Sequence, residues 1–271
     1  MKSEPLIRLA SFLAVFAIFA IAEALAPRRL REFSRAARWP ANLGVALIYS
    51  LLIRLMLPAG ITGFAFFCTA HRWGLLNLIH LPRCAAIALS ILALDLVIYL
   101  QHVLFHAIPA LWRLHRMHHA DLDFDVTTGV RFHPLEIVIS TAVKLGAIAI
   151  LGPPAVAVLA FELLLNSTSL FNHANLAMPP PLDAILRLIV VTPEMHRVHH
   201  SIVVRETNSN FGFNLPWWDR MLGTYRAQPE AGHLAMTIGL DDFRTPGDLR
   251  LLQMLSQPWH VAAPKGVRRV T

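Results

Sequence analysis

Five apolar segments run through the first two thirds of the chain, and they restrict its fold more than any other feature. They are residues 6–26, 43–67, 85–105, 137–151 and 154–171. A helix of about 21 residues is about 30 Å long, which matches the hydrocarbon core of a bilayer. In the second segment, Pro58 predicts a kink or a break. The last two segments are shorter and are joined by Gly152-Pro153-Pro154, which predicts a helical hairpin that dips into the membrane or crosses it.

The composition agrees with a membrane protein. Of the 271 residues, 55% are hydrophobic and 15% are charged, whereas soluble domains contain about 25% charged residues. This amount of apolar sequence also excludes a disordered chain. After Pro179-Pro180-Pro181 the sequence becomes more polar, and we expect that part to face water. The sequence therefore predicts an all-α, multi-span helical membrane protein.

Arginines follow the first apolar segment directly. They are Arg28, Arg29, Arg31, Arg35 and Arg38. Because Lys and Arg are enriched in cytoplasmic loops, we interpret residues 28–38 as cytoplasmic. A signal peptide cleaved near Ala26 is the alternative interpretation of residues 6–26, but the apolar chain that follows favours a membrane anchor. The net charge of +7 reflects such loops, and we expect no nucleic-acid partner because no nucleic-acid-binding module is recognisable.

Fourteen histidines are the second unusual feature. His102 and His106 are about one helical turn apart, and the pattern His-Arg-X-His-His occurs at residues 115–119 and again at 196–200. Positions i, i+3 and i+4 share one face of a helix. At this histidine frequency, one HxxHH pattern is expected by chance about 0.04 times. With residues 28–38 in the cytoplasm, successive crossings place all of these histidines on the cytoplasmic side.

Clustered imidazoles indicate a metal site, because they are good ligands for Fe, Zn, Cu and Ni. The three stretches offer eight imidazoles, which is more than one ion uses and favours two ions. The HExxH motif of zinc hydrolases is absent, and non-haem iron chemistry with oxygen is favoured. A structural zinc site, a pH-sensing cluster, a zinc-dependent membrane hydrolase with Glu194 as its base and a non-enzymatic metal-binding membrane protein are the alternatives. The isolated His71, His80, His233 and His260 are interpreted as ordinary surface or interfacial residues.

An ordered set of motifs resembles the fatty acid hydroxylase and sterol desaturase superfamily of integral membrane di-iron oxygenases. The motifs are HxxxH (102–106), HRMHH (115–119), RFHPLE (131–136), FNHAN (171–175), HRVHH (196–200), NSNFG (208–212) and WDRMLGT (218–224). The resemblance covers about residues 85–226. It implies N-terminal membrane helices in residues 1–84, a di-iron domain with membrane spans and a cytosolic cap in residues 85–226, and a cytosolic tail in residues 227–271.

The resemblance also implies which side chains form the site. A cytosolic, histidine-rich helical cap would hold two non-haem iron ions. The implied metal ligands are His102, His106, His115, His118, His119, His173, His196, His199 and His200. The side chains implied to orient these ligands through hydrogen bonds are His133, Asn172, Asp95 and Asp125. For Asp95, which lies inside an apolar segment, a hydrogen bond to a neighbouring helix is an equal explanation.

The function implied by the resemblance is that of an oxidoreductase. It would hydroxylate or desaturate a C–H bond of a lipid substrate with dioxygen as co-substrate, in an integral membrane protein whose metal site faces the cytoplasm. The sequence has no Rossmann glycine motif and no cysteine iron–sulfur motif, so a separate electron donor (a reductase, ferredoxin or cytochrome) is expected. Sterol, fatty acyl, alkyl ether lipid and carotenoid substrates all stay open. By position, residues 122–128 and the chain beyond residue 226 are expected to shape the substrate entrance.

Overall fold

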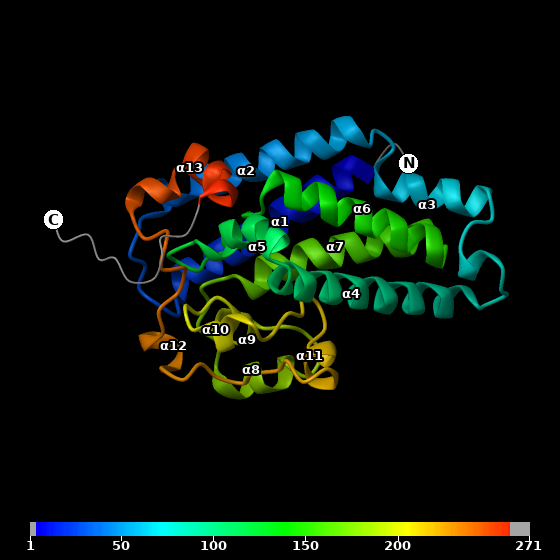
Figure 1. Ribbon diagram of the computed structural model, residues 1–271. Coiled ribbons are helices and arrows are strands. Elements are labelled where there is room, and N and C mark those ends of the chain that lie inside the picture. The colour runs from blue at the N-terminus through cyan, green and yellow to red at the C-terminus, as the bar shows by residue number, and fades with distance from the viewer. Residues whose placement is uncertain (1–3, 261–271) are drawn as a thin grey trace.

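Long helices form the body of the molecule in the computed structural model, which describes residues 4–260 (Figure 1). They are α1 (Glu4–Leu25), α2 (Arg35–Met56), α3 (Gly60–Ala70), α4 (Arg83–Ala107), α6 (Pro134–Leu151) and α7 (Ala155–Asn172). Helix α7 contacts α1, α3 and α4, while α6 contacts α2, α3 and α4. The helices run lengthwise beside one another, so the bundle has two distinct ends.

Shorter helices gather toward one end of the bundle, at the left of Figure 1. They are α5 (Pro109–His119), α8 (Pro180–Leu186), α9 (Pro193–His199), α10 (Val204–Thr207), α11 (Trp217–Met221), α12 (Gly232–Ala235) and α13 (Leu251–Ser256). Four short 3-10 helices are η1 (Leu75–Asn77), η2 (Thr128–Val130), η3 (Pro246–Leu249) and η4 (Gln257–Trp259). Extended pairing within residues 4–260 is limited to two isolated β-bridges. We call helices α5 and α8–α13, with their loops, the cap.

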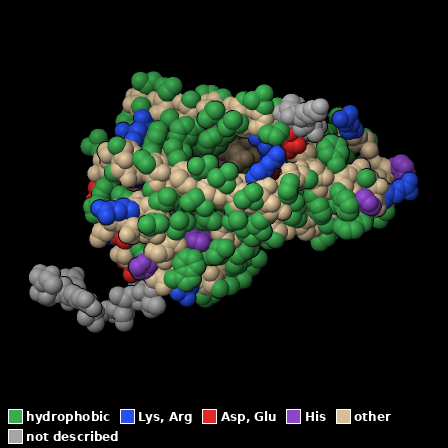
Figure 2. All heavy atoms as spheres, turned by 90° about the horizontal axis from the view of Figure 1, so that it is seen from above, with side chains coloured by type: hydrophobic (Ala, Val, Ile, Leu, Met, Phe, Trp, Pro, Cys, Tyr) green, Lys and Arg blue, Asp and Glu red, His purple; other side chains and the backbone are tan. Residues whose placement is uncertain are grey.

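Five helices among the described residues are long and apolar enough to cross a membrane, with α2 and α3 counted as one. Many of their large apolar side chains face outward, among them Leu13 on α1, Leu51 on α2 and Leu89 on α4. In Figure 2, hydrophobic side chains cover much of the middle of one face, and most charged side chains lie toward its two ends. Apolar surface of this extent is typical of contact with a membrane. The prediction of an all-α, multi-span membrane protein is confirmed.

The break predicted at Pro58 is present. Helix α2 ends at Met56 and α3 begins at Gly60. A proline disfavours the helical conformation of the residue before it, and Leu57 has φ −133° and ψ 73°. The second apolar segment therefore forms two helices that meet at an angle.

A tight turn joins α6 to α7. Gly152 ends α6 in the left-handed conformation with φ +66°, which glycine adopts without strain. A Cβ at Gly152 would also lie 2.5 Å from the carbonyl oxygen of Trp73. Pro153 and Pro154 follow, and α7 begins at Ala155. The predicted helical hairpin is therefore present, and each of its helices has 18 residues, or about 27 Å.

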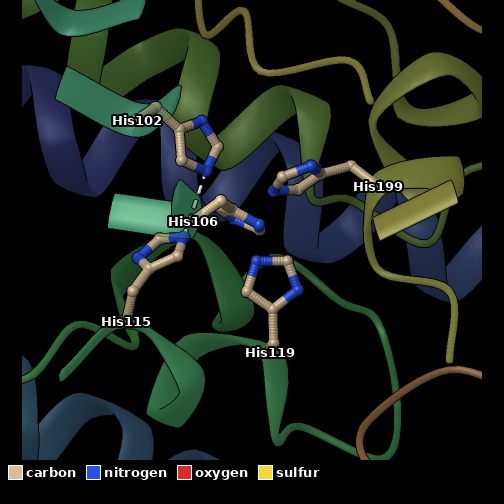
Figure 3. Close-up of side chains that lie close together, drawn as sticks. All are labelled: His102, His106, His115, His119 and His199. Carbon is tan, nitrogen blue, oxygen red and sulfur yellow. Dashed lines mark hydrogen bonds between the residues drawn. The ribbon is translucent and has the colours of Figure 1, made fainter. Parts of the chain in front are cut away.

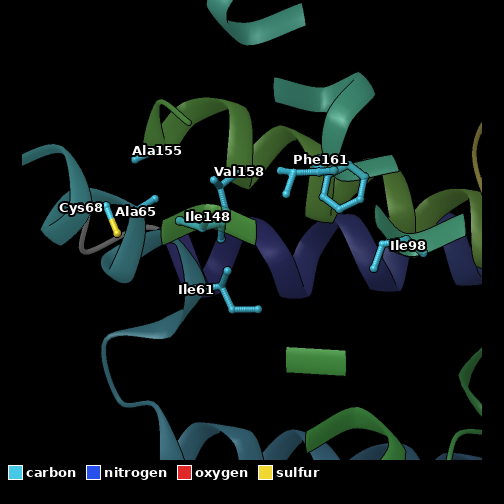
Figure 4. Packing of buried hydrophobic residues seen from close by; sticks show 9 residues of the cluster. Ile61, Ala65, Cys68, Ile98, Ile148, Ala155, Val158 and Phe161 are labelled. Atoms are coloured by element: carbon cyan, nitrogen blue, oxygen red, sulfur yellow. The ribbon is translucent and has the colours of Figure 1, made fainter. Parts of the chain in front are cut away.

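The buried apolar core of the bundle lies where α3, α4, α6 and α7 meet (Figure 4). It includes Ile98 of α4, Ile148 of α6 and Phe161 of α7. Helix α3 contributes the small residues Ala65 and Cys68, which are fully buried. Because lipid is as apolar as these side chains, helices in a membrane associate through close packing, which small residues permit.

Ion pairs also join helices within the bundle. Arg8 Nη1 of α1 lies 2.9 Å from Glu162 Oε2 of α7, and Lys144 Nζ of α6 lies 2.6 Å from Glu162 Oε1. Charged groups in an apolar environment are costly unless they are paired. These contacts therefore fix the positions of α1 and α6 relative to α7.

Polar contacts fasten the first two helices to the cap end of the bundle. Glu23 is fully buried near the end of α1 and accepts hydrogen bonds from the backbone N–H groups of Val126 and Asn175. Arg38 of α2 is fully buried as well, and its Nε donates to Asp121 Oδ1 across 2.9 Å. The loop after α5 and the segment after α7 are thereby held against α1 and α2.

Candidate metal centre

Two groups of histidines meet at the cap end of the bundle. The first group consists of His102 and His106 from α4, His115 and His119 from α5, and His199 from α9 (Figure 3). Each side chain offers one ring nitrogen, and these five nitrogens lie within 4.8 Å of one another. The Nε2 atoms of His102 and His115 are 3.0 Å apart.

The second group consists of four histidines. It contains His118 from α5, His173 at the end of α7, His196 from α9 and His200 directly after α9, with their nitrogens again within 4.8 Å. The Nε2 atom of His173 lies 3.1 Å from Nε2 of His118 and 3.1 Å from Nε2 of His196. The structure thus brings together all nine histidines that the sequence singled out, while their role as metal ligands stays a prediction.

Helical spacing distributes each HxxHH motif between the two groups. In α5, His115 and His119 lie in the first group and His118 in the second. In and after α9 the division is reversed. His199 lies in the first group, whereas His196 and His200 lie in the second. The groups are adjacent, since the rings of His119 and His200 stack with centroids 4.6 Å apart.

The outer nitrogens of several rings are held by oxygen atoms. His102 Nδ1 bonds the carbonyl oxygen of Phe211 across 2.7 Å, and His199 Nδ1 bonds that of Ser209 across 2.7 Å. His115 Nδ1 lies 2.6 Å from a carboxylate oxygen of Glu136. When Nδ1 donates to an oxygen, Nε2 keeps a free lone pair and its direction is fixed. These contacts therefore aim Nε2 into the centre of the first group.

The inner nitrogens fit metal ligation. Among the described residues, no hydrogen-bond partner contacts the buried Nε2 atoms of His106, His119 and His199 or either ring nitrogen of His200. Such an atom costs about 1–3 kcal/mol, and a bound ion would remove that cost. Two nitrogens that bind one ion at right angles, each at about 2.0–2.1 Å, lie about 3 Å apart. The separations of 3.0–3.1 Å found in both groups match this value.

Burial keeps five of the imidazoles outside the membrane spans neutral. Removal from water, followed by the effect of neighbouring histidines, lowers the pKa of His118, His119, His196 and His199 well below the ordinary value. For His173, burial lowers the pKa to about 3. A metal ion binds the neutral ring, because protonation occupies the lone pair. These five rings are therefore in the protonation state that metal binding requires.

Aromatic rings enclose the two groups. Phe124 lies against His200 with ring centroids 5.0 Å apart, and Phe211 lies against His106 with centroids 5.1 Å apart. Of the nine histidines, His106 is the one that is not fully buried, and Trp112 covers it at 4.8 Å between centroids. The first group therefore comes nearest to the surface beside the junction of α4 and α5.

Part of the loop expected at the substrate entrance lines a pocket of about 310 Å³, together with residues of the chain beyond position 226. All of residues 122–128 are buried. Gly129 follows this loop and packs so closely on the end of α7 that a Cβ there would lie 2.5 Å from the carbonyl oxygen of Ser169. The loop is therefore an inner wall of the second histidine group and one wall of this pocket, and its role at a substrate entrance stays a prediction.

The region that carries the histidines matches a known protein family. The family model described as fatty acid hydroxylase matches residues 87–224, which contain all nine histidines. The chain belongs to the fatty acid hydroxylase family.

The chain is similar to an ornithine lipid hydroxylase and to an alkylglycerol monooxygenase. Ornithine lipid hydroxylase OlsE of Rhizobium tropici is 32% identical over 179 residues, which cover 66% of this chain and 51% of the relative. Alkylglycerol monooxygenase of Homo sapiens is 29% identical over 159 residues, which cover 57% of this chain and 34% of the relative. The aligned region thus spans about half of the first relative and a third of the second. No solved structure matches the chain significantly.

His133 and Asp125 lie at the edge of the site. Both were predicted to orient the metal ligands. His133 is the N-cap residue of α6, and its Nε2 is 3.2 Å from the carbonyl oxygen of Leu255. Asp125 accepts a hydrogen bond from Arg38 across 2.5 Å. Both residues connect elements that surround the histidines, and their predicted orienting role stays a prediction.

The other two predicted side chains hold the segment that follows α10. Asp95 accepts hydrogen bonds from Asn214 Nδ2 and Trp218 Nε1 across 2.7 and 2.8 Å. Asn172 donates to the carbonyl oxygen of Phe213 across 3.0 Å. This segment includes the carbonyl group of Phe211, which bonds His102. Asp95 and Asn172 thus contact the segment that holds His102, and their orienting role stays a prediction.

Sequence reasoning missed the role of Glu136. This residue lies in the first turn of α6 and is buried, and one of its carboxylate oxygens contacts His115. Pairs of a carboxylate and a histidine commonly orient metal ligands. The signal was present, since Glu136 closes the RFHPLE motif, but its distance of 21 residues from His115 gave no indication of contact.

Glu194 and His233 form a polar cluster outside the histidine groups. Glu194 contacts Arg28 at 2.6 Å, Arg197 at 2.9 Å and His233 at 2.9 Å. Burial would raise the pKa of Glu194, but these three partners hold it below its usual range. The carboxylate proposed as a hydrolase base is thus engaged in structural contacts. His233 was interpreted as a surface or interfacial residue, and it is buried rather than at the surface.

Proposed function

We propose that this protein is a membrane-bound, non-haem di-iron oxygenase that hydroxylates a C–H bond of a lipid. The observation that carries the proposal is the pair of adjacent histidine groups with unpartnered inner nitrogens. The first group would hold one ion and the second group the other. The overall reaction would consume dioxygen, two electrons and two protons, and would yield the hydroxylated lipid and water.

Iron bound by the two groups would supply reductive activation of dioxygen for insertion of one oxygen atom into the C–H bond. The residues of this chain would position the ions and protect the reaction. Glu136 and the carbonyl groups of Phe211 and Ser209 would fix the orientation of ligand rings through Nδ1. Phe124 and Phe211 would exclude water from the two groups. A dry site prevents side reactions of a strong oxidant.

A lipid substrate is supported by two observations. The helices that carry His102, His106 and His173 are candidate membrane spans, so the centre lies at the end of an apolar bundle. The relatives are called an ornithine lipid hydroxylase and an alkylglycerol monooxygenase, and both names describe oxygen insertion into a lipid. We therefore propose hydroxylation rather than desaturation, with a substrate that combines a polar headgroup and a hydrocarbon chain.

We also propose that the metal centre faces the cytoplasm. The basic loop at residues 28–38 lies at the same end as the histidines, since Arg28 bonds Glu194 and Arg38 bonds Asp121. Cytoplasmic loops are enriched in such residues. The electrons would come from a separate reductase, ferredoxin or cytochrome on that side.

The test is metal analysis followed by isotope labelling. Detergent-purified protein, produced with iron and zinc both supplied, is expected to contain about two irons per chain, as the two groups of histidines indicate. With a reductant and ¹⁸O₂, one labelled oxygen atom should appear in a lipid product. Zinc at the same stoichiometry, with no labelled lipid after iron reconstitution, would instead support a hydrolase. Folded protein without bound metal would overturn the proposal.

A further inference from the structure

An apolar groove runs along the bundle between α4 and α6. It has a volume of about 510 Å³, and its walls include Ala93, Leu96 and Val97 from α4 and Val143, Gly146 and Ile150 from α6. All of its lining residues are apolar or glycine, and both helices are candidate membrane spans. A groove of this kind excludes a polar headgroup and accepts hydrocarbon.

Small residues keep this groove open. A Cβ built on Gly146 would meet no other atom within 4 Å. Gly146 is therefore not required for close packing of two helices, in contrast to Gly129 and Gly152. A larger side chain at this position would project into the groove, and its Cβ would meet no atom of the described residues.

One end of the groove leads toward the metal centre. Val97 is five residues before His102 on α4, which is about 7.5 Å along the helix axis, and Val143 is seven residues after Glu136 on α6, which is about 10.5 Å. Along the helix axes, Gln101 lies between Val97 and His102, and Ser140 lies between Val143 and Glu136. Gln101 Nε2 donates to Ser140 Oγ across 3.0 Å. The oxygen of the Gln101 amide is buried without a partner. A polar pair thus separates the apolar groove from the histidines.

We propose that this groove holds the hydrocarbon chain of the lipid substrate, and that the Gln101–Ser140 pair marks the level at which the chain leaves the groove for the metal centre. This inference rests on the proposed function. The substrate is the occupant, rather than a lipid of the surrounding bilayer, because Val97 at the inner end of the groove lies one helical turn from Gln101, the residue before His102. The depth of the groove would then select substrates by chain length.

The experiment compares Gly146→Leu with Ala142→Leu. Ala142 is exposed on the same helix and does not line the groove, so its substitution adds the same side chain at a similar depth. Metal-free protein in nanodiscs is labelled with a palmitoyl lipid that carries a diazirine in mid-chain, with and without excess unlabelled lipid. We expect saturable labelling of residues 93–101 and 140–151, reduced roughly tenfold or more by Gly146→Leu because hydrocarbon contacts are lost, and unchanged by Ala142→Leu.

Product analysis with iron-loaded protein supplies the second measurement. Gly146→Leu should shift the hydroxylated products toward shorter chains, while Ala142→Leu should not. Equal labelling and equal products in both variants, with ¹⁸O still inserted by the wild type, would overturn the groove assignment alone. Groove labelling that Gly146→Leu removes, in a protein that inserts no oxygen into any lipid, would support the groove and overturn the proposed function.

Discussion

His115 Nδ1 lies 2.6 Å from Oε1 of Glu136, and this contact joins the first histidine group to the first turn of α6. It holds the ring of His115 with Nε2 toward the other four histidines. In Glu136→Ala the ring would be free to turn, and we expect metal affinity or activity to fall by about 10–100-fold. Iron titration of the purified variant measures the affinity.

The variant Glu136→Gln separates the effect of the hydrogen bond to His115 from the effect of the carboxylate charge. Glu136→Gln keeps an oxygen that can accept the hydrogen bond, so its affinity should lie between those of Glu136→Ala and the wild type. Glu230→Gln is a matched control, because Glu230 forms an exposed pair with Arg205. Wild-type iron affinity in Glu136→Ala would contradict the orienting role.

Single histidine substitutions test the two groups separately. His199→Ala removes a nitrogen from the first group, and His118→Ala removes one from the second. Each variant should lose metal loading and activity but should still insert into the membrane, because both residues lie outside the candidate spans. Mass spectrometry of bound metal is the measurement.

Two exposed histidines provide the comparison. His71 and His260 lie outside both groups, so His71→Ala and His260→Ala should keep the full metal content. If metal were lost in either of these, or retained in both His118→Ala and His199→Ala, the ligand assignment would be wrong.

Arg38 is expected to stabilise the structure. It is fully buried and donates to Asp121 and Asp125. Arg38→Met would leave two buried carboxylates without their main cationic partner, and removal of one member of a buried pair costs about 3–5 kcal/mol. Thermal unfolding in detergent should show a much lower midpoint. Arg31→Met, at an exposed position of the same basic loop, should show almost none of this loss.

The metal-free protein should lose stability in mild acid. An unfolded histidine has a pKa of about 6.5, whereas burial lowers the pKa of His173 to about 3 in the folded protein. Below about pH 6.5 the unfolded state therefore binds protons that the folded state does not bind. The stabilising contribution of the neutral ring is complete above about pH 6.5, and it decreases as the pH falls from there toward 3.

The melting temperature of chelator-treated protein at pH 7.5 and at pH 5 measures this dependence. A lower value at pH 5 is expected, and the difference should be smaller in His173→Gln because one buried ring is absent. An identical difference in that variant and the wild type would assign the acid sensitivity to other groups.

The sequence was sufficient to predict the helices and the nine histidines. The five apolar segments became α1, α2 with α3, α4, α6 and α7. The two shorter segments form the predicted hairpin of α6 and α7, and each of these helices is a candidate span. The HxxHH spacing placed His115 and His118 on one short helix, since helical periodicity is a local property. Pro58 ended α2 for the same reason.

Sequence patterns did not predict the contacts between segments that are far apart in the chain. Glu23 looked like an interruption near the end of an apolar segment, yet it accepts hydrogen bonds from Val126 and Asn175. His233 looked like a surface residue, yet it is buried against Glu194. In each case the partner lies at least 39 residues away, and no local pattern encodes such a contact.

The contacts between the end of α1 and the segments around the histidines limit how much of the chain can be removed from a recombinant fragment. Motifs and the matched region suggest a catalytic piece at about residues 85–226, with the flanking regions 1–84 and 227–271 as additions. Glu23 on one side, and His233 with its contact to Glu194 on the other, reach the shell of the histidine centre from outside that piece. A recombinant fragment cut at the motif boundaries would therefore lack part of its own scaffold. Expression trials, chimaeras and tag placement should therefore keep residues 23–233 together.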